Sequence, residues 1–345
     1  MRPGGIWLIH TEADEVFAAI DGGGSRSELI VFGEDLKLRE RRCGGALNFN
    51  EAPDAAADAI WTLTNGICAD FLYAGISGAG NRGGEIHKQL CGSAFGQVRV
   101  ESDLKNLMLA EFAADAGCCV ISGTGSSCLA KRADIGGREG GYRRIGGWGY
   151  LIDSRGSGFD IGRCALEAML MTFDGRASGG EALRLLWRER FGKPPEEMLS
   201  EIYDGGKRFI AGIAPMVMEA AAQGDAVSSR IIDENIGAIA GMISAAADFI
   251  CADENTDSCP DVSPRFRAVL TGGVAENLPG AVNAVAAKLT GELNAKKVLS
   301  VELASTPQIC GAALGALAMC GIAPDHGVRD EIVSEYRKYS FQSGH

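Results

Sequence analysis

Two short glycine-rich segments, each set between two apolar runs, recur in this 345-residue chain. The first is FAAIDGGGSRSELIVF at residues 17–32, and the second is CCVISGTGSSCLAKR at residues 118–132. Each pattern is typical of a strand, a tight turn and a second strand. Residues 20–25 align with residues 121–126, which favours an internal repeat and two similar domains. The alternative is coincidence, because glycine hairpins are common and their spacing is permissive.

The first hairpin contains more glycine than its turn requires. A tight hairpin turn needs one or two glycines, whereas this one has Gly22, Gly23 and Gly24. Without Cβ atoms, several backbone N–H groups can approach a phosphate, and the hydroxyl of Ser25 adds a donor. Asp21, just before the turn, is suited to hold a hydrated Mg²⁺ that neutralises phosphate charge. The alternative is a plain hairpin with a capping aspartate.

Two further glycine sites favour a nucleotide over a plain turn. In the second hairpin the candidate phosphate-binding residues are Gly123, Thr124, Gly125 and Ser126. A third site, Gly272 and Gly273, follows the apolar run RFRAVLT and suits an adenosine pocket at a strand end. The sequence has no G-x-x-x-x-G-K-[ST] pattern, which argues against a P-loop NTPase.

The order of the remaining elements predicts an α/β protein. Strands are expected at LKLRERRCGG, FLYAGIS, QVRVESD and RFRAVLT, with helices at APDAAADAIWTLTNGICAD and LKNLMLAEFAADAG. Long helices are expected over residues 160–190, 206–223 and 226–252. A last helix is predicted to have Thr306 as its N-cap, Pro307 in its first turn and Gly321 just beyond its end.

Length, charge and cysteine content restrict the class of protein. A chain of 345 residues favours two domains. The net charge of −12 argues against nucleic acid or an anionic membrane as partner, and no apolar run is expected to span a membrane. The eleven cysteines and four histidines show neither disulfide nor zinc spacing, which favours free thiols and a cytoplasmic location.

Three further residues are candidates for a site. Asp103 stands where a strand meets a helix, where a carboxylate can take a proton from an attacking hydroxyl. An N-cap is the simpler role for Asp103, and both roles can hold only if its side chain turns away from the helix, with Ser102 as the alternative cap. Asn48 ends a glycine turn, which asparagine tolerates without any further function. Trp148 lies between glycines in GGWG, which favours a ligand-facing wall over a core position.

An ordered set of motifs resembles the BadF/BadG/BcrA/BcrD ATPase family, and within it the N-acetylglucosamine kinases. The motifs span about residues 15–322 and are IDGGGSRSELIVF, AGISGAGN, VESDLKNLMLAEF, VISGTGSSCLA, GGWGYLIDSRGSGFDIGR and LTGGVAEN. The resemblance implies two ribonuclease H-like domains of the actin-like ATPase fold flanking a nucleotide cleft. The first would be residues 14–120, closed by the helix 306–321. The second would be residues 121–305, and residues 1–13 would be an extension.

The resemblance also implies roles for individual residues. ATP would lie between the two hairpins, with its base near Gly272 and Gly273 and with Mg²⁺ near Asp21. Asp103 matches the catalytic base of the family, whereas Asn48, Gly147 and Trp148 match positions that line the amino-sugar site. The implied protein is a homodimeric, ATP-dependent kinase that phosphorylates a hydroxyl of an amino sugar such as N-acetylglucosamine.

One segment departs from the family pattern. Where these kinases usually read G-D-E-G-S, this chain has Asp153, Ser154, Arg155, Gly156 and Ser157. The acidic residue expected to bind sugar hydroxyls is replaced by Ser154, and the next acid by Arg155. A cation at this position is suited to an anionic group on the acceptor, such as a carboxylate. The identity of the acceptor therefore stays open.

Two other functions are possible within this resemblance. Some members of the family are ATPases that activate a dehydratase through an iron–sulfur cluster shared by a dimer. Cys128 and Cys164 lie in the second half of the chain but form no cluster pattern. A sugar-sensing regulator would bring a DNA-binding segment, for which residues 1–13 are too short. The kinase is therefore the preferred hypothesis, with the partner-coupled ATPase as its alternative.

Overall fold

A computed structural model describes residues 14–24, 26–49, 52–91, 94–136, 138–252, 265–290 and 298–342. The predicted extension at residues 1–13 and Ser25 lie outside these described residues. The chain forms two compact units. The first unit contains the described residues up to Ala113 and from Thr306 onward, and the second contains those from Ala114 to Ser305.

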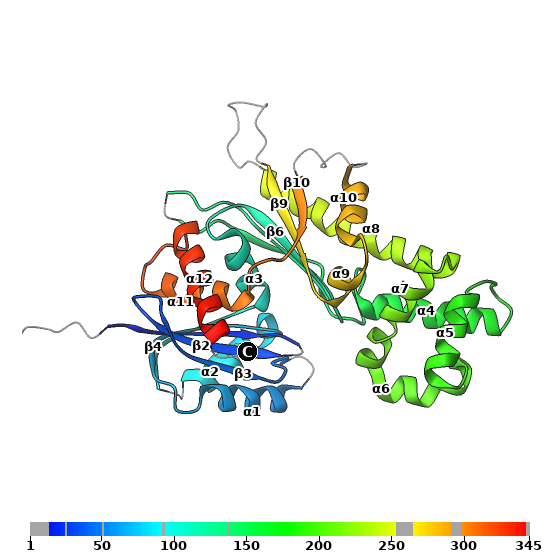
Figure 1. Ribbon diagram of the computed structural model, residues 1–345, viewed down its shortest axis with the longest axis horizontal. Helices are drawn as coiled ribbons and strands as arrows, with labels where there is room; N and C mark the ends of the chain where they lie inside the picture. The colour runs from blue at the N-terminus through cyan, green and yellow to red at the C-terminus, as the bar shows by residue number, and fades with distance from the viewer. Residues whose placement is uncertain are drawn as a thin grey trace, which may run out of the picture. The chain divides into compact units, whose positions relative to one another are not determined.

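The first unit is a five-stranded sheet with helices on both faces (Figure 1). Its strands are β1 (Val16–Gly22), β2 (Ser27–Gly33), β3 (Leu38–Gly44), β4 (Ala69–Ile76) and β5 (Phe95–Glu101). Its helices are α1 (Pro53–Thr64), α2 (Ala79–Cys91), α3 (Asp103–Phe112), α11 (Gln308–Met319) and α12 (His326–Gln342). The strand order is β3-β2-β1-β4-β5, with β1, β2 and β3 antiparallel and β4 and β5 parallel to β1.

Strand β1 is buried on both faces because its alternate side chains enter two separate cores. Ala18 and Ile20 pack with α1 and α2, whereas Phe17 and Ala19 pack with α3, α11 and α12. Successive side chains of a strand point to opposite faces, so an unbroken apolar run suits a strand covered on both sides. The C-terminal helices α11 and α12 thus complete the core of the first unit.

The second unit repeats the same sheet with different helices. Its strands are β6 (Gly117–Ser122), β7 (Ser126–Lys131), β8 (Tyr142–Ile145), β9 (Phe266–Thr271) and β10 (Val298–Leu303). The order β8-β7-β6-β9-β10 has the same antiparallel and parallel pairings as β3-β2-β1-β4-β5. This correspondence confirms the predicted α/β class and supports the internal repeat over coincidence.

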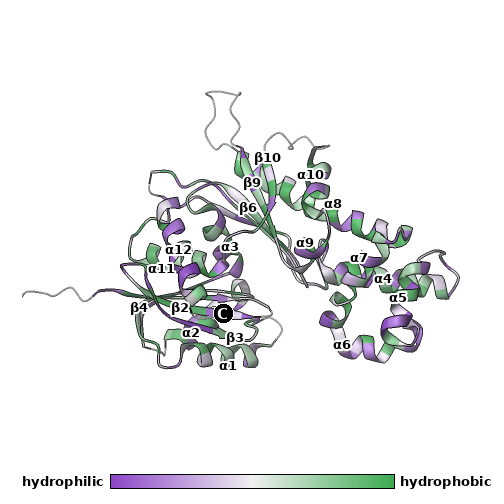
Figure 2. Cartoon of the chain, viewed as in Figure 1, coloured by the Kyte–Doolittle hydropathy of each residue, from purple (hydrophilic) through white to green (hydrophobic). Residues whose placement is uncertain are grey.

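The helices of the second unit pack into one continuous core. They are α4 (Gly158–Phe173), α5 (Glu181–Phe191), α6 (Leu199–Ala211), α7 (Ala214–Ala222), α8 (Ala226–Cys251), α9 (Gly273–Asn277) and α10 (Ala281–Thr290), with a short 3₁₀ turn at Pro195–Glu197. By length and composition alone, α8 could cross a membrane, contrary to the expectation that no apolar run is long enough. More than half of its apolar stretch is buried in the core, and hydrophobic and hydrophilic segments alternate along its ribbon (Figure 2). These features are those of a core helix.

Several predicted element boundaries differ from those of the structure. The two units divide between Ala113 and Ala114, and the predicted domain boundary at 120/121 falls within β6. The single helix over 160–190 is two helices, because Gly175, Gly179 and Gly180 adopt left-handed backbone angles between them. Strands β8 and β10 and helices α2 and α12 were not predicted.

The cap of α11 also differs from the prediction. The helix begins at Gln308 with Pro307 in the N-cap position, and no side chain caps it. The backbone N–H of Thr306 instead donates to the Glu111 carboxylate at 2.8 Å, which ties the start of α11 to the end of α3. Gly321 does lie beyond the end of α11, with a φ of 94°.

Candidate functional site

The tip of the first hairpin lies beside the loops that follow β3 and β4. The backbone N–H of Ser77 donates to Gly22 O at 2.7 Å, and that of Leu47 donates to Gly23 O at 2.9 Å. Because β1 and β4 are parallel, their carboxyl ends meet at one edge of the sheet, the usual place for a ligand in such folds. Asn48 lies here as well, since its amide nitrogen is 3.8 Å from the position a Cβ on Gly24 would take.

Asp21 ends β1 at this edge and is held by a residue that the sequence did not single out. The Nδ2 of Asn106, on α3, donates to Asp21 Oδ1 at 2.7 Å and is also near the carbonyl oxygens of Ile20 and Gly75. Asn106 is completely buried, and its Oδ1 has no hydrogen-bond partner among the described residues. A Cβ on Gly75 would fall against this amide, which explains the glycine there. The only sequence signal for Asn106 was its polar side chain on a helix whose other residues mostly pack in the core.

The environment of Asp21 disfavours its ionised form. Burial raises the pKa of Asp21 to about 7, and the nearby carboxyl groups of Asp103 and Glu28 add to the rise. The hydrogen bond from Asn106 opposes it. A cation beside Asp21 would relieve both the burial cost and the repulsion, so its surroundings fit the predicted Mg²⁺.

Asp103 is the first residue of α3, not its cap. Ser102 occupies the N-cap, and its hydroxyl accepts the N–H of Leu104 at 3.3 Å. Asp103 Oδ1 accepts the same N–H at 3.0 Å and the Ser102 hydroxyl at 3.1 Å. Burial raises the pKa of Asp103 above its usual range, although hydrogen bonds from Ser102, Leu104 and Ser77 oppose the rise. Ser102, the alternative cap considered from the sequence, is therefore the N-cap of α3, although the Asp103 side chain does not turn away from the helix.

In the second unit, the second hairpin and the third glycine site lie together. Strand β9 runs parallel to β6, and the N atom of Gly273 is 3.8 Å from the position a Cβ on Gly123 would take. Gly272 has a φ of 98°, and a Cβ there would lie 2.7 Å from the Ser122 backbone. Gly272 is thus required for this close approach, and it brings the loop after β9 to the hairpin tip.

The start of α4 is fixed to the same hairpin tip. The N–H of Gly158 donates to Gly123 O at 2.7 Å, and that of Phe159 donates to Thr124 O at 3.3 Å. The Ser126 hydroxyl donates to Arg155 O at 2.6 Å. The Ser126 side chain thereby holds the loop before α4, and its contact with a phosphate stays a prediction. The side chain of Thr124, by contrast, is exposed.

The segment with the predicted sugar-site residues precedes α4 in the second unit. Gly147 has a φ of 72°, and a Cβ there would contact Ser127. Trp148 is 65 % exposed, and the Arg144 guanidinium lies 5.3 Å from the centre of its ring. The Ser154 carbonyl accepts the Ser157 hydroxyl at 2.5 Å. Trp148 is therefore a surface residue of this unit, as expected for a wall residue and not for a core residue.

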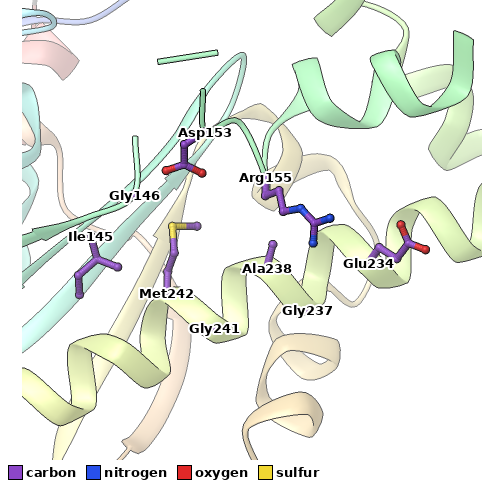
Figure 3. A pocket seen from close by; sticks show the side chains of 9 residues that line it. All are labelled: Ile145, Gly146, Asp153, Arg155, Glu234, Gly237, Ala238, Gly241 and Met242. Carbon is purple, nitrogen blue, oxygen red and sulfur yellow. The ribbon is translucent and has the colours of Figure 1, made fainter. Parts of the chain in front are cut away.

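A cavity of about 550 Å³ lies between this segment and α8. Figure 3 shows Arg155 pointing into it, between Asp153 on one side and Glu234 on the other. The α8 face opposite includes three small residues, Gly237, Ala238 and Gly241, together with Glu234 and Met242. Arg155 thus lines a charged cavity, whereas Asn48 lies in the first unit with Asp21 and Asp103.

This chain is similar in sequence to two kinases. An N-acetylmuramic acid/N-acetylglucosamine kinase from Clostridium acetobutylicum is 28 % identical over 241 residues, which cover 62 % of this chain and 74 % of that protein. An N-acetyl-D-glucosamine kinase from Dictyostelium discoideum is 28 % identical over 161 residues, 46 % of each chain.

The fold is shared with a solved structure at lower identity. A putative N-acetylglucosamine kinase from Chromobacterium violaceum has a TM-score of 0.65 and 22 % identity, covering 87 % of this chain and 98 % of that one. The sequence profile of the BadF/BadG/BcrA/BcrD ATPase family matches residues 19–316. The match covers most of the chain and confirms the resemblance drawn from its motifs, so this protein belongs to the BadF/BadG/BcrA/BcrD ATPase family.

Proposed function

We propose that this protein is an ATP-dependent kinase that transfers the γ-phosphoryl group of MgATP to a hydroxyl of an amino sugar such as N-acetylglucosamine. Membership of the ATPase family supports the use of ATP. The names of two relatives, each an amino-sugar kinase, support the class of acceptor. In the first unit the residues proposed to act on MgATP are Asp21 and Asp103, and in the second unit they are those of the hairpin at Gly123–Ser126.

The main support for the proposal is that neither backbone angles nor close contacts within the chain require glycine at both hairpin tips. Gly24, Gly123 and Gly125 have no left-handed backbone angle. Among the described residues, a Cβ on any of them would meet no atom closer than 3.8 Å. By contrast, a Cβ on Gly22 would lie 2.9 Å from the Leu47 side chain. Alanine would fit the chain at the three tip positions, so their open backbone is best explained by a ligand that approaches it closely.

Asp103 is proposed as the general base. A carboxyl with a raised pKa accepts a proton more readily near neutral pH than an ordinary aspartate does. Its Oδ1 is fixed by the Ser102 hydroxyl and the Leu104 N–H, which orients the group towards an incoming hydroxyl. Removal of that hydroxyl proton would accompany attack on the γ-phosphorus.

Asp21 is proposed to hold Mg²⁺, with Asn106 orienting its carboxylate. When bound, Mg²⁺ supplies positive charge that neutralises the phosphate oxygens. The bond from Asn106 leaves Asp21 Oδ2 available for the ion or for one of its waters. Backbone N–H groups of the hairpin tips would bind the phosphates directly.

The remaining functional expectations are also proposals. We propose that Gly272 and Gly273 lie near the adenine and that Asn48, Gly147, Trp148, Ser154 and Arg155 contribute to acceptor binding. Arg155 gives the acceptor site a cation, which favours an acceptor that carries a carboxylate over a neutral one. A homodimer, a cytoplasmic location and the absence of nucleic-acid or membrane partners stay predictions.

The partner-coupled ATPase receives less support. Cys128 is completely buried in the core of the second unit. Burial raises the pKa of the Cys164 thiol to about 11, and Asp160 adds to the rise, so the thiolate that ligates metal is disfavoured there. Neither residue is therefore suited to an exposed cluster at a subunit junction.

The test is ADP release from MgATP with N-acetylglucosamine, N-acetylmuramic acid, glucosamine, glucose or no sugar. We expect one amino sugar to stimulate release, and Asp103→Asn to abolish the stimulation. Gly125→Ala, which fits the fold, should weaken ATP binding without unfolding the protein. A slow rate indifferent to every sugar would contradict the kinase and favour an ATPase that serves a protein partner.

A further inference from the structure

One lysine that the sequence analysis did not single out lies at the tip of the second hairpin. Lys207 is on α6, yet its Nζ is 4.0 Å from the position a Cβ on Gly125 would take. The same Nζ is 5.7 Å from the centre of the Tyr150 ring. Some 80 residues of sequence separate Lys207 from Gly125, so the tertiary fold of the second unit alone brings this cation to the hairpin.

We infer that Lys207 is a phosphate-binding residue, whose ammonium binds the β- or γ-phosphate of the nucleotide at the tip of the β6–β7 hairpin. This inference rests on the proposed use of ATP. A lysine supplies three N–H donors and a full positive charge, whereas the hairpin amides supply only partial charges. A cation at this position therefore adds a charge to the hairpin tip, where the N–H of Gly123 already donates to Gly125 O at 2.9 Å.

A break in α6 positions the lysine. Gly206 has a φ of 53° and a ψ of −145°, which interrupts the helix just before Lys207. These angles are accessible essentially to glycine alone. An unbroken helix with an ordinary residue at this position would direct the lysine stem differently, because helix geometry fixes the direction of each side chain. Gly206 therefore sets the direction in which the side chain of the next residue, Lys207, leaves the helix.

An aromatic pair supports the ammonium from the side. The ring of Tyr150 packs edge-on against Phe159, with ring centres 5.1 Å apart. Phe159 in turn donates its backbone N–H to Thr124 O in the hairpin. The attraction between a cation and an aromatic face limits the positions the ammonium can take. Lys207, Tyr150 and the hairpin tip are therefore neighbours within the second unit.

The alternative is a structural role, in which the lysine stem covers Tyr150. The two roles predict different dependence on the ligand. A phosphate contact affects only the nucleotides that carry the contacted phosphate, whereas a packing defect also weakens the binding of adenosine, which has none.

The experiment is calorimetric binding of ATP, ADP and adenosine to the wild type, Lys207→Met and Lys207→Arg. Arg208→Met is the matched control, because this neighbouring cation lines a different cavity with Arg190 and Phe191. We expect Lys207→Met to weaken ATP binding by about ten- to a hundredfold, as for a lost hydrogen bond to a charged group. Adenosine affinity should stay within about twofold, and Lys207→Arg should restore most of the ATP affinity.

The outcomes separate this inference from the proposed function. Equal losses for ATP and ADP would assign Nζ to the β-phosphate, and a loss confined to ATP would assign it to the γ-phosphate. If the wild type binds ATP and Lys207→Met binds it equally well, the inference is overturned while the kinase stands. A parallel loss of adenosine affinity would also overturn it, in favour of packing. Failure of the wild type to bind any nucleotide would contradict the proposed function itself.

Discussion

The raised pKa of Asp21 predicts that ionisation of this carboxyl lowers the free energy of unfolding. In the fold this carboxyl titrates at about 7 instead of the ordinary 3.8. The folded chain therefore binds the Asp21 proton more tightly than the unfolded chain does. The stabilisation due to that proton is complete below about pH 3.8 and is lost as the pH rises through about 7. At 1.36 kcal/mol for each pKa unit, the loss is about 4 kcal/mol.

Asp21→Asn removes this titration and keeps the shape of the side chain. An asparagine amide oxygen can still accept the hydrogen bond from Asn106 Nδ2. We therefore expect the variant to gain stability relative to the wild type as the pH rises from 4 to 8, by about 4 kcal/mol in total. The variant should at the same time lose MgATP turnover, a trade of activity for stability.

The measurement is urea unfolding followed by circular dichroism at intervals between pH 4 and pH 8, without Mg²⁺ or nucleotide. Asp35→Asn is the control, because hydrogen bonds with Lys37 lower the pKa of this fully exposed aspartate in the same unit. The control should show no such gain above pH 5. Stability curves of Asp21→Asn and the wild type that run parallel from pH 4 to pH 8 would refute the reasoning.

Three further predictions concern α3 and the packing of helices. Asp103→Asn should lower kcat by about 10²- to 10⁴-fold in the ADP-release assay and should not lower the melting temperature, because it removes a buried carboxyl whose pKa is raised. Ser102→Ala should cost about 1 kcal/mol of stability as a lost cap. Asn106→Ala removes a bond that favours ionised Asp21, so the acidic limb of the pH–rate profile should move to higher pH. Gly311→Ala should destabilise the first unit by about 1–3 kcal/mol or more, because its Cβ would fall against the α3 backbone. Gly237→Ala, which faces open space in α8, should instead raise the melting temperature, and equal effects of the two alanines would contradict both explanations.

The sequence by itself determined the features that depend on local chemistry. An apolar run on each side of a glycine-rich turn identified both hairpins. The similarity between the two hairpins indicated two similar sheets. The motif order identified the family, because each motif combines a strand end with a turn of defined composition. Each of these signals is contained in a short stretch of sequence, so no knowledge of distant contacts was needed.

The tertiary structure alone decided which distant residues meet. The sequence did not identify Asn106 as a partner of Asp21, because only the packing of α3 against β1 and β4 brings its amide to that carboxylate. Lys207 likewise reaches the second hairpin through the break in α6 and the folding of the second unit. Strand β10 went unpredicted because its identity comes from parallel pairing with β9, which is a contact between distant segments. Local sequence specifies turns and caps, whereas the pairing of remote polar groups follows from how the elements pack.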